Sequence, residues 1–147
     1  MPTDERNDPY RSYNFRIEID NITVGAFSEV SGLTAEGDIV EYRAGTDKPN
    51  NARKLVGLRK YANITLKRGY TKNNELWAWY VNIANGVPDR RDGTIILMNE
   101  AHQDVMRWHF ENAWLNKVEG PALNATGNTI AIESAELCHE GLTLELA

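Results

Sequence analysis

The sequence predicts a mainly β protein: an antiparallel β-sandwich or barrel of short strands with one packed α-helix. Runs that alternate apolar and polar residues recur along the chain, separated by Gly, Asn and Pro turn signals. Between residues 61 and 83 the apolar spacing changes from about two residues to about 3.6, so a strand should lead into an amphipathic helix. The 147 residues contain no internal repeat or linker and fit one domain.

The N-terminal part is predicted to form a flexible arm followed by a hairpin. Residues 1–12 are charged and proline-flanked and offer no apolar pattern to bury, so we expect an arm ahead of one β domain at residues 13–147. Residues 15–19 alternate apolar and polar side chains, and an Asp-Asn turn leads into residues 22–24. This pattern is typical of a β-hairpin.

Three further strands are predicted before the helix. Short strands are expected at residues 27–30 and 39–42, and a half-buried strand at residues 62–69, with Ala62, Ile64 and Leu66 toward the core. Residues 43–60 contain glycine, proline, two asparagines and several basic residues, and we interpret them as a long loop. A structureless connection of that length is uncommon in a compact domain unless it has a function.

One helix is predicted to begin near Thr71 or Asn73, either of which could cap it, and to end at Gly86. Its apolar stripe should face the core. The residues of this stripe are Leu76, Trp77, Tyr80, Ile83 and Ala84. Trp79 lies off the stripe, and we interpret it as a subunit contact or as the edge of the core.

The C-terminal half is predicted to be a series of strands. Residues 94–98 form a continuous apolar run, as expected for a strand buried on both faces, and residues 105–111 should return beside it. Residues 116–128 are interpreted as loop. The apolar phase then changes twice between residues 130 and 146, which fits either one strand with two bulges or a strand that bends from one sheet to another.

Composition disfavours several classes of function. The chain has 21 acidic and 16 basic residues and a formal net charge of -5, which disfavours non-specific nucleic-acid binding on the outer surface. Cys138 is the only cysteine, so an intrachain disulfide and a cysteine-rich zinc site are excluded. No apolar run approaches the roughly 20 residues that span a bilayer, and the polar start does not resemble a signal peptide. We therefore expect synthesis in the bacterial cytoplasm, no membrane insertion, and release by lysis where the protein acts outside the cell.

No catalytic, metal-binding or cofactor-binding pattern stands out. The three histidines lack ligand spacing, and no nucleophile sits in a Gly-x-Ser-x-Gly setting, so we expect no catalytic residue, metal or cofactor. Two alternatives stay open. Carboxylates such as Glu133, Glu136 and Glu140 are compatible with a paired-carboxylate glycoside hydrolase, and the four tryptophans are compatible with a monomeric β-sandwich module that binds a ligand.

Four segments resemble one known family. They are FSEVSGL at residues 27–33, EYR at residues 41–43, the strand-to-helix junction at residues 61–83, and LNATGN at residues 123–128. In this order they resemble the tail tube proteins of contractile phage tails, a family that includes the tubes of phage-like contractile injection particles. The resemblance spans about residues 13–144 and implies that copies of the β domain at residues 13–147 assemble into a tube.

The resemblance implies a structural subunit and not an enzyme. Tube subunits of this family assemble as stacked rings, typically hexameric, around a lumen that conducts cargo or DNA. The implied partners are further copies of the chain, a surrounding sheath protein, and baseplate and spike proteins. The implied location is a phage tail or a phage-like particle. The related ring-forming tube protein of a secretion system is the alternative.

The resemblance also implies a contact segment. In the family, a loop with a Lys-Leu-x-Gly sequence contacts neighbouring subunits, and residues 54–57 carry this sequence here, with Val56 where proline is usual. The predicted inter-subunit contacts are Arg53, Lys54, Leu55 and Leu58. Without a partner, the same segment would be a solvated surface loop.

The strand at residues 62–69 supplies the candidate lining of the lumen. Asn63, Thr65 and Lys67 should face away from the core because successive side chains of a strand point to opposite faces. In a closed tube that side would be the wet lumen, where mixed polar side chains would let cargo slide. The same alternation also fits a sheet that faces bulk solvent on the outside of the tube.

Overall fold

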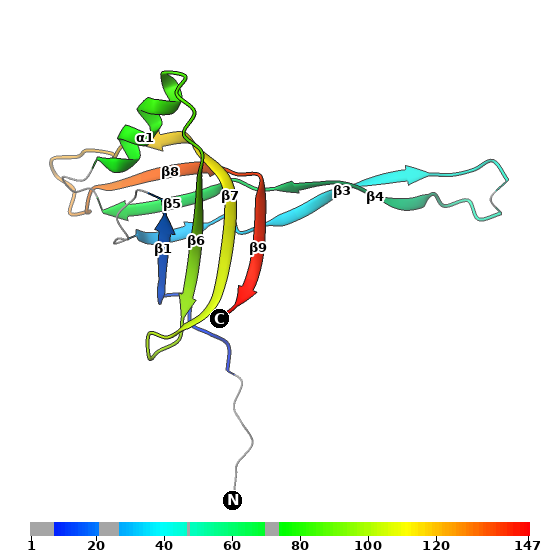
Figure 1. Cartoon of the computed structure of the whole chain (residues 1–147), viewed down its shortest axis with the longest axis horizontal. Helices are drawn as coiled ribbons and strands as arrows, with labels where there is room; N and C mark the ends of the chain where they lie inside the picture. Colours follow the sequence, from blue (N-terminus) through cyan, green and yellow to red (C-terminus); the bar gives the residue numbers. More distant parts are fainter. Residues whose placement is uncertain (1–7, 21–26, 47, 70–73) are drawn as a thin grey trace, which may run out of the picture.

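The computed structural model describes residues 8–20, 27–46, 48–69 and 74–147. Within them, two antiparallel β layers and one helix form the body, and a two-stranded hairpin projects far from it (Figure 1). The predicted mainly β fold with one packed helix is confirmed.

The first layer, called the β6 layer, contains four strands. Its order is β1–β6–β7–β9, and each neighbouring pair is antiparallel. The bounds are β1 Phe15–Ile19, β6 Arg91–Met98, β7 Asp104–Glu119 and β9 Gly141–Leu146. As the sequence predicts, β6 is buried on both faces, at Ile95 and Ile96.

The second layer, called the β5 layer, shares β7 with the first. Its order is β7–β8–β5–β2, again antiparallel. The bounds are β2 Phe27–Ser31, β5 Ile64–Gly69 and β8 Ile132–Cys138. β7 pairs with β6 and β9 through residues 104–113 and with β8 through residues 114–119. One long strand therefore belongs to both layers, whose strands cross in Figure 1.

The length of β7 corrects the boundaries expected from the sequence. Loop structure is predicted from residue 116, but β7 continues to Glu119. Asn112 has a φ of 52°, which asparagine adopts more readily than most residues, and its N–H donates to Asp92 Oδ1 at 3.0 Å. The register shifts again between Leu115 and Lys117. These irregularities break the period of two, so the alternating pattern ends before the strand does.

The C-terminal segment explains the changes of apolar phase. β8 pairs with β5 and β7, whereas β9 pairs with β7 in the other layer. The chain therefore bends from one layer to the other, which is the second of the two predicted arrangements. His139 sits at this bend, with Nε2 3.0 Å from the carbonyl oxygen of Ala62 and Nδ1 3.1 Å from that of Gly141. Ile130 lies before β8 and is exposed.

The core lies between the two layers and the helix. In β5, Ile64 and Leu66 are buried and Thr65 is partly exposed, so the predicted alternation is confirmed at these positions. β8 contributes Leu137 opposite Ile64 and Ala135 opposite Leu66. Other large core side chains are Ile17, Trp79, Phe110 and Leu115.

The helix α1 spans Glu75–Ala84, follows Asn74, and is followed by Gly86 at a φ of 79°. Its end agrees with the predicted glycine stop, because a positive φ costs glycine little. The two predicted caps, Thr71 and Asn73, lie outside the described residues.

The predicted core stripe of α1 is wrong at Trp77 and Ala84, which are exposed. Trp79 is instead fully buried, at 0% exposure. The buried face follows the spacing i, i+3, i+7 through Leu76, Trp79 and Ile83, so it is rotated from the predicted stripe.

The largest correction concerns residues 43–60, which are not one structureless loop. β3 Ala35–Tyr42 and β4 Arg53–Tyr61 pair as a long antiparallel hairpin, called the hairpin arm (Figure 1). Their register shifts between Gly37 and Ile39. At Gly57 a Cβ would lie 2.5 Å from the carbonyl oxygen of Asp38, so glycine allows the two strands to approach at this bulge.

Two N-terminal expectations lie partly outside the described residues. The strand predicted at residues 22–24 falls there, and the described partner of β1 is β6. Of residues 1–12, the structure describes residues 8–12, where Arg11 Nε lies 3.9 Å from Glu100 Oε1. The flexible N-terminal arm stays a prediction.

Candidate assembly surfaces

The hairpin arm presents apolar side chains on both of its faces. Opposite residues in the register share a face, and successive residues alternate between faces. The first face carries Ile39 and Val56, and Leu58 lies at the register shift between the pairs Gly37–Arg59 and Ile39–Val56. The second face carries Val40, Tyr42 and Leu55. All six side chains are exposed, Val56 to 84% and Leu58 to 80%.

The hairpin arm packs little against the rest of its own chain. β3 and β4 contact chiefly each other, and Figure 1 shows the arm reaching away from the body. A lone two-stranded hairpin is at best marginally stable in water, and extended exposed apolar surface marks a site of contact. The arm is therefore a candidate docking element.

The arm carries one pair of opposite charges on each face. Lys60 Nζ lies 3.0 Å from Asp38 Oδ1, and this hydrogen bond raises the pKa of Lys60. Glu41 and Lys54 are opposite each other in the register. Glu41 and Lys54 lie on the first face, whereas Lys60 and Asp38 lie on the second, so each face carries charges of both signs beside its exposed apolar side chains.

The predicted contact residues lie on β4 in two sets. Arg53 and Leu55 belong to the second face, Lys54 belongs to the first, and Leu58 lies at the register shift. They share a strand but not a surface. A partner that covers all four must enclose the arm, or two partners must share it.

The outer face of the β5 layer is polar. Thr65 and Lys67 point away from the core, and Asn63 precedes β5 and is exposed. Lys67 Nζ lies 3.7 Å from Glu29 Oε2 of β2, and Asn63 Nδ2 donates to Glu136 Oε1 of β8 at 2.8 Å. The same face carries Ser31, Lys117, Glu119 and Ser134. The candidate lining residues are thus brought together, beside carboxylates that the prediction did not include.

The β5 layer has two open edges. Among the described strands, β2 pairs only with β5, and residues 114–119 of β7 pair only with β8. β6 follows β7 no further than Ala113, and β9 follows it no further than Glu111. The backbone N–H and C=O groups along these edges can therefore pair with another strand.

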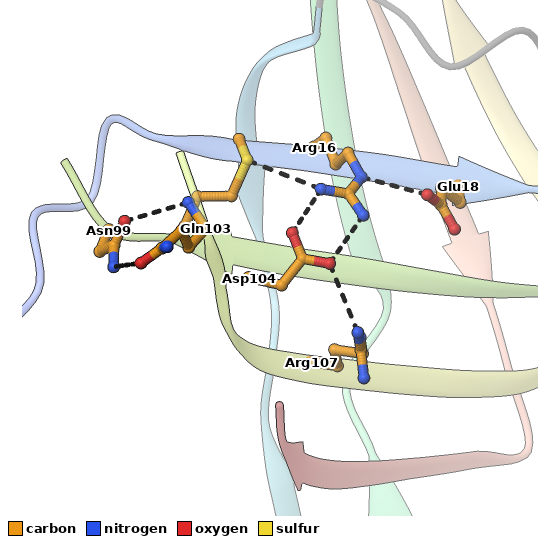
Figure 2. Close-up of polar contacts among 7 residues, drawn as sticks. Arg16, Glu18, Asn99, Gln103, Asp104 and Arg107 are labelled. Atoms are coloured by element: carbon orange, nitrogen blue, oxygen red, sulfur yellow. Dashed lines mark hydrogen bonds and ion pairs between the residues drawn. The ribbon is translucent and has the colours of Figure 1, made fainter. Parts of the chain in front are cut away.

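The outer face of the β6 layer carries a charged network (Figure 2). Arg16 of β1 donates to Asp104 of β7 through Nη1 at 2.5 Å and Nη2 at 2.8 Å, and its Nε donates to Glu18 at 3.1 Å. Arg107 Nη2 donates to Asp104 at 3.4 Å. The hydrogen bonds from Arg16 hold the pKa of Asp104 below its usual range, and the pKa of Arg16 is raised in return.

Sequence reasoning missed this network. Arg16 and Asp104 lie 88 residues apart, and only the pairing of β1 with β6 and of β6 with β7 brings them together. Ile96 lies between Arg16 and Arg107 in the cross-strand register and is buried on this outer face. The alternation at residues 15–19 indicated an exposed face, but no local signal marked the partner.

The carboxylates considered for glycoside hydrolysis do not converge. Glu133 of β8 forms a buried ion pair with Arg68 of β5, whereas Glu136 points to the outer face of the same layer. Glu140 accepts a hydrogen bond from Arg90 at 3.0 Å. Each carboxylate has a basic or amide partner, and the two on β8 point to opposite faces.

Cys138 has no sign of nucleophilic activation. It is partly buried, and burial raises the pKa of its thiol, with the negative charge of Glu136 adding to the rise. A raised pKa lowers the thiolate fraction, which is the reactive form. In the part of the chain that the structure describes, no cluster of three or more His, Cys, Asp or Glu side chains could hold a metal ion. None of the described helices is long and apolar enough to span a membrane.

Comparison with protein families adds to this geometry. A family model described as T4-like virus tail tube protein gp19 matches residues 11–143. A search of curated proteins found no match.

Solved structures of contractile particles are similar over nearly the whole chain. A chain from the extended sheath-tube complex of an extracellular contractile injection system, PVC, is 29% identical at a TM-score of 0.86, and the match covers 96% of this chain and 94% of that one. A chain from the tube-terminating cap of the anti-feeding prophage is 28% identical at a TM-score of 0.85, with coverage of 99% and 97%. A type six secretion system protein is 7% identical at a TM-score of 0.61, with coverage of 90% and 83%, and shows likeness of fold alone.

Proposed function

This chain belongs to the family of the T4-like virus tail tube protein gp19, and we propose that its copies stack as hexameric rings around a conducting lumen. It is a tube subunit of the type found in contractile injection systems. The family match over residues 11–143 carries the proposal, because it includes both open edges of the β5 layer and the whole hairpin arm.

Ring closure would use the two open edges of the β5 layer. The edge of β2 in one copy would pair with residues 114–119 of β7 in the next copy, which would satisfy the free backbone groups of both. This contact is head-to-tail, because different surfaces of the two copies meet. A head-to-tail contact closes into a ring where the rotation between copies allows it, and closure leaves no free edge.

The outer face of the β5 layer would then line the lumen. Asn63, Thr65 and Lys67 are the candidate lining residues, together with the acidic side chains of Glu29 and Glu136 beside them. Positive and negative charges alternate with amide and hydroxyl groups on this face. Such a lining offers no continuous apolar surface to which an unfolded cargo would adhere, and no single charge sign that would hold DNA.

The hairpin arm would provide contacts between copies. Leu55 on the second face and Leu58 at the register shift both expose apolar surface, so both side chains would gain from burial against neighbours. The contact role of Arg53 and Lys54 belongs to the same proposal. The two basic residues would set the orientation of docking through acidic partners.

The proposed partners outside the tube are a sheath protein, baseplate and spike proteins. The PVC relative belongs to a sheath-tube complex, which supports a surrounding sheath here. The formal net charge of -5 would suit a basic inner surface of that sheath. The particle would assemble in the bacterial cytoplasm and leave the cell by lysis.

A secretion-system tube is the second candidate. Its support is the shared fold of the type six secretion system protein, whose identity to this chain is far lower than that of the injection-system relatives. Neighbouring genes would separate the candidates. Sheath, baseplate and spike genes without capsid genes would indicate an injection particle, and added capsid genes would indicate a phage.

The decisive experiment is negative-stain electron microscopy of the purified protein, combined with light scattering for mass. We expect rings or tubes with six subunits per turn in class averages. A chain that stays monomeric at high concentration, and whose tryptophan fluorescence changes on addition of a sugar polymer, would overturn the proposal in favour of a binding module.

A further inference from the structure

We propose that charge sets the register between neighbouring copies of the ring, with Lys117 on β7 of one copy pairing with Glu29 on β2 of the next. This inference rests on the proposed tube function and names the side chains that fix how the two open edges of the β5 layer meet. Both side chains lie on the outer face of that layer, at opposite edges. Their exposed fractions are 57% for Glu29 and 61% for Lys117, so both can reach a neighbour.

The two open edges run in opposite directions where copies follow one another around a ring. Strands β7, β8, β5 and β2 are neighbours in that order, and each pair is antiparallel, so β2 runs opposite to β7 of its own copy. Rotation about the ring axis leaves the direction of β7 along that axis unchanged. β2 of one copy therefore meets β7 of the next as an antiparallel pair, in which side chains directly opposite each other share a face.

Two cross-strand rows of outward side chains run from one edge of the β5 layer to the other. From β2 to β7, the first row is Glu29, Lys67, Ser134 and Glu119. In the same direction, the second row is Ser31, Thr65, Glu136 and Lys117. At the seam, where two copies meet, the β7 end of a row in one copy continues into the β2 end of a row in the next. The register of the seam is defined by which rows are joined.

A level join, in which each row continues into the same row of the next copy, is disfavoured. It places Glu119 directly opposite Glu29 of the next copy, and like charges in that position destabilise a strand pair. It also places Lys117 opposite Ser31, which has a hydroxyl group but no charge. In a ring this repulsion recurs at every seam.

A join that is staggered by one row replaces the repulsion with attraction. The second row of one copy then continues into the first row of the next, so Lys117 lies opposite Glu29. Four side chains of alternating charge follow one another across this seam, namely Glu136 and Lys117 of one copy and Glu29 and Lys67 of the next. Within one chain, Lys67 Nζ already lies 3.7 Å from Glu29 Oε2. The staggered join therefore extends a charge pattern that is present on each side of the seam.

The inward side chains also match in the staggered join. Val118 lies between the two rows on β7, and Leu115 lies beyond the second row. The stagger brings Val118 opposite Phe27 and Leu115 opposite Val30 of the next copy. All four side chains belong to the core or pack against it. The apolar interior therefore continues across the seam.

A stagger in the opposite direction would shorten the seam. It joins the first row of one copy to the second row of the next, so Glu119 lies opposite Ser31. β2 ends at Ser31, and the next residue, Gly32, has a φ of 91°. Lys117 and Leu115 would then lie beyond the end of β2 and have no strand partner there. Among the three joins, only the one that pairs Lys117 with Glu29 brings opposite charges together and keeps all of β2 paired.

Complementation between two charge variants tests the inference. A ring made only of Glu29→Lys chains, or only of Lys117→Glu chains, has two charges of one sign at every seam. We expect each variant alone to need at least a tenfold higher concentration than the parent to form rings, while its monomer keeps the circular dichroism spectrum of the parent. An equimolar mixture should form rings at the concentration that the parent needs, because alternation of the two variants around six positions places opposite charges at every seam.

The mixture isolates the contact between copies, because contacts within each chain are the same before and after mixing. The matched control is Glu119→Lys, on the same strand and face but one row away, which should assemble at the concentration of the parent. Light scattering and negative-stain electron microscopy score ring formation.

Disulfide formation gives a second, direct measurement of the register. All chains carry Cys138→Ser, and assembled mixtures of two single-cysteine variants are treated with a mild oxidant. Glu29→Cys chains should form at least tenfold more dimer with Lys117→Cys chains than with Glu119→Cys chains, because a disulfide needs Cβ atoms about 4 Å apart.

The possible joins give different results. Glu29→Lys or Glu119→Lys that assembles at a lower concentration than the parent, or a disulfide that favours Glu119→Cys, would indicate the level join and overturn the staggered one. Two charge variants that assemble like the parent, or a mixture of folded variants that stays unassembled, would overturn the pairing of Lys117 with Glu29 and leave the tube function standing. A parent protein that forms no rings would overturn both proposals.

Discussion

The side chain of Trp79 is fully buried, and its indole N–H still has a hydrogen-bond acceptor. Its indole N–H donates to the carbonyl oxygen of Asp89 at 2.8 Å, and the guanidinium of Arg91 lies 4.6 Å from the ring centroid. Arg91 is in turn paired with the Asp89 carboxylate at 2.9 Å, and hydrogen bonding from Arg91 lowers the pKa of Asp89. A tryptophan is buried at low cost only where its N–H finds a partner. This loop carbonyl therefore explains why Trp79, and not Trp77, faces the core.

Replacing Trp79 by alanine should lower the free energy of unfolding by about 3–5 kcal/mol, the usual cost of removing a large aromatic side chain from a core. Trp77→Ala is the matched control, since Trp77 is 53% exposed on the same helix and should cost less than about 1 kcal/mol. Urea denaturation of the monomer, followed by circular dichroism, measures both. Equal losses for the two variants would contradict the assignment of Trp79 to the core.

Asp104 makes the stability of the folded protein depend on pH in the acidic range. Its pKa is lowered in the folded state by hydrogen bonds from Arg16, so its contribution to stability is fully present above the unfolded pKa of about 3.9 and is lost as the pH falls through the folded value. Asp104→Asn should therefore destabilise the protein at pH 7 and make little difference well below pH 4. Urea midpoints of parent and variant across this range test the sign.

The control for the acid dependence is Glu18→Gln. Glu18 also accepts a hydrogen bond from Arg16 but is half exposed, so its loss should change the urea midpoint less than Asp104→Asn does. A difference between parent and Asp104→Asn that stays constant from pH 7 to pH 3 would show that the carboxylate charge is not the cause.

At the scale of elements, sequence patterns predict those strands that bury one face. β5 follows the period of two because Ile64 and Leu66 pack on the core while Thr65 does not. The hairpin arm buries neither face within one chain, so β4 shows no such period and resembles a charged loop. The predicted contact residues all lie on β4, but their division between two faces follows from strand pairing that the sequence does not display.

Two exposed leucines of β4 allow a paired test of assembly. Leu55→Asp and Leu58→Asp should each impair stacking of rings while the monomer still folds, because an unpaired carboxylate at a buried contact costs several kcal/mol. Electron microscopy scores tube length, and a thermal melt scores folding. Normal tubes from both variants would contradict a contact role for the arm, and failure of only one would restrict the contact to the surroundings of that side chain.

At the scale of the whole molecule, the order of motifs predicts the family and the fold, but not the surfaces that join copies. The open edges of the β5 layer exist because β7 leaves one layer at Asn112 and enters the other, and a positive φ at one residue is not visible as a pattern. The exposure of Leu144 and Leu146 is similarly invisible, since the alternation of Leu142, Leu144 and Leu146 with polar residues predicts burial, whereas the last two side chains are exposed.

The lumen assignment makes the broadest prediction, because it fixes which layer faces inward in every copy. Thr65 lies on the polar outer face of the β5 layer, so in closed tubes a cysteine at this position should be shielded from a maleimide too large to enter the channel. Thr143→Cys, on the outer face of β9, is the control that should react along the tube wall where no sheath is present. Both variants carry Cys138→Ser, and both should react fully as monomers. Rapid labelling of Thr65→Cys along the whole wall, and not only at tube ends, would place the β5 layer on the exterior and rule out its role as the lining.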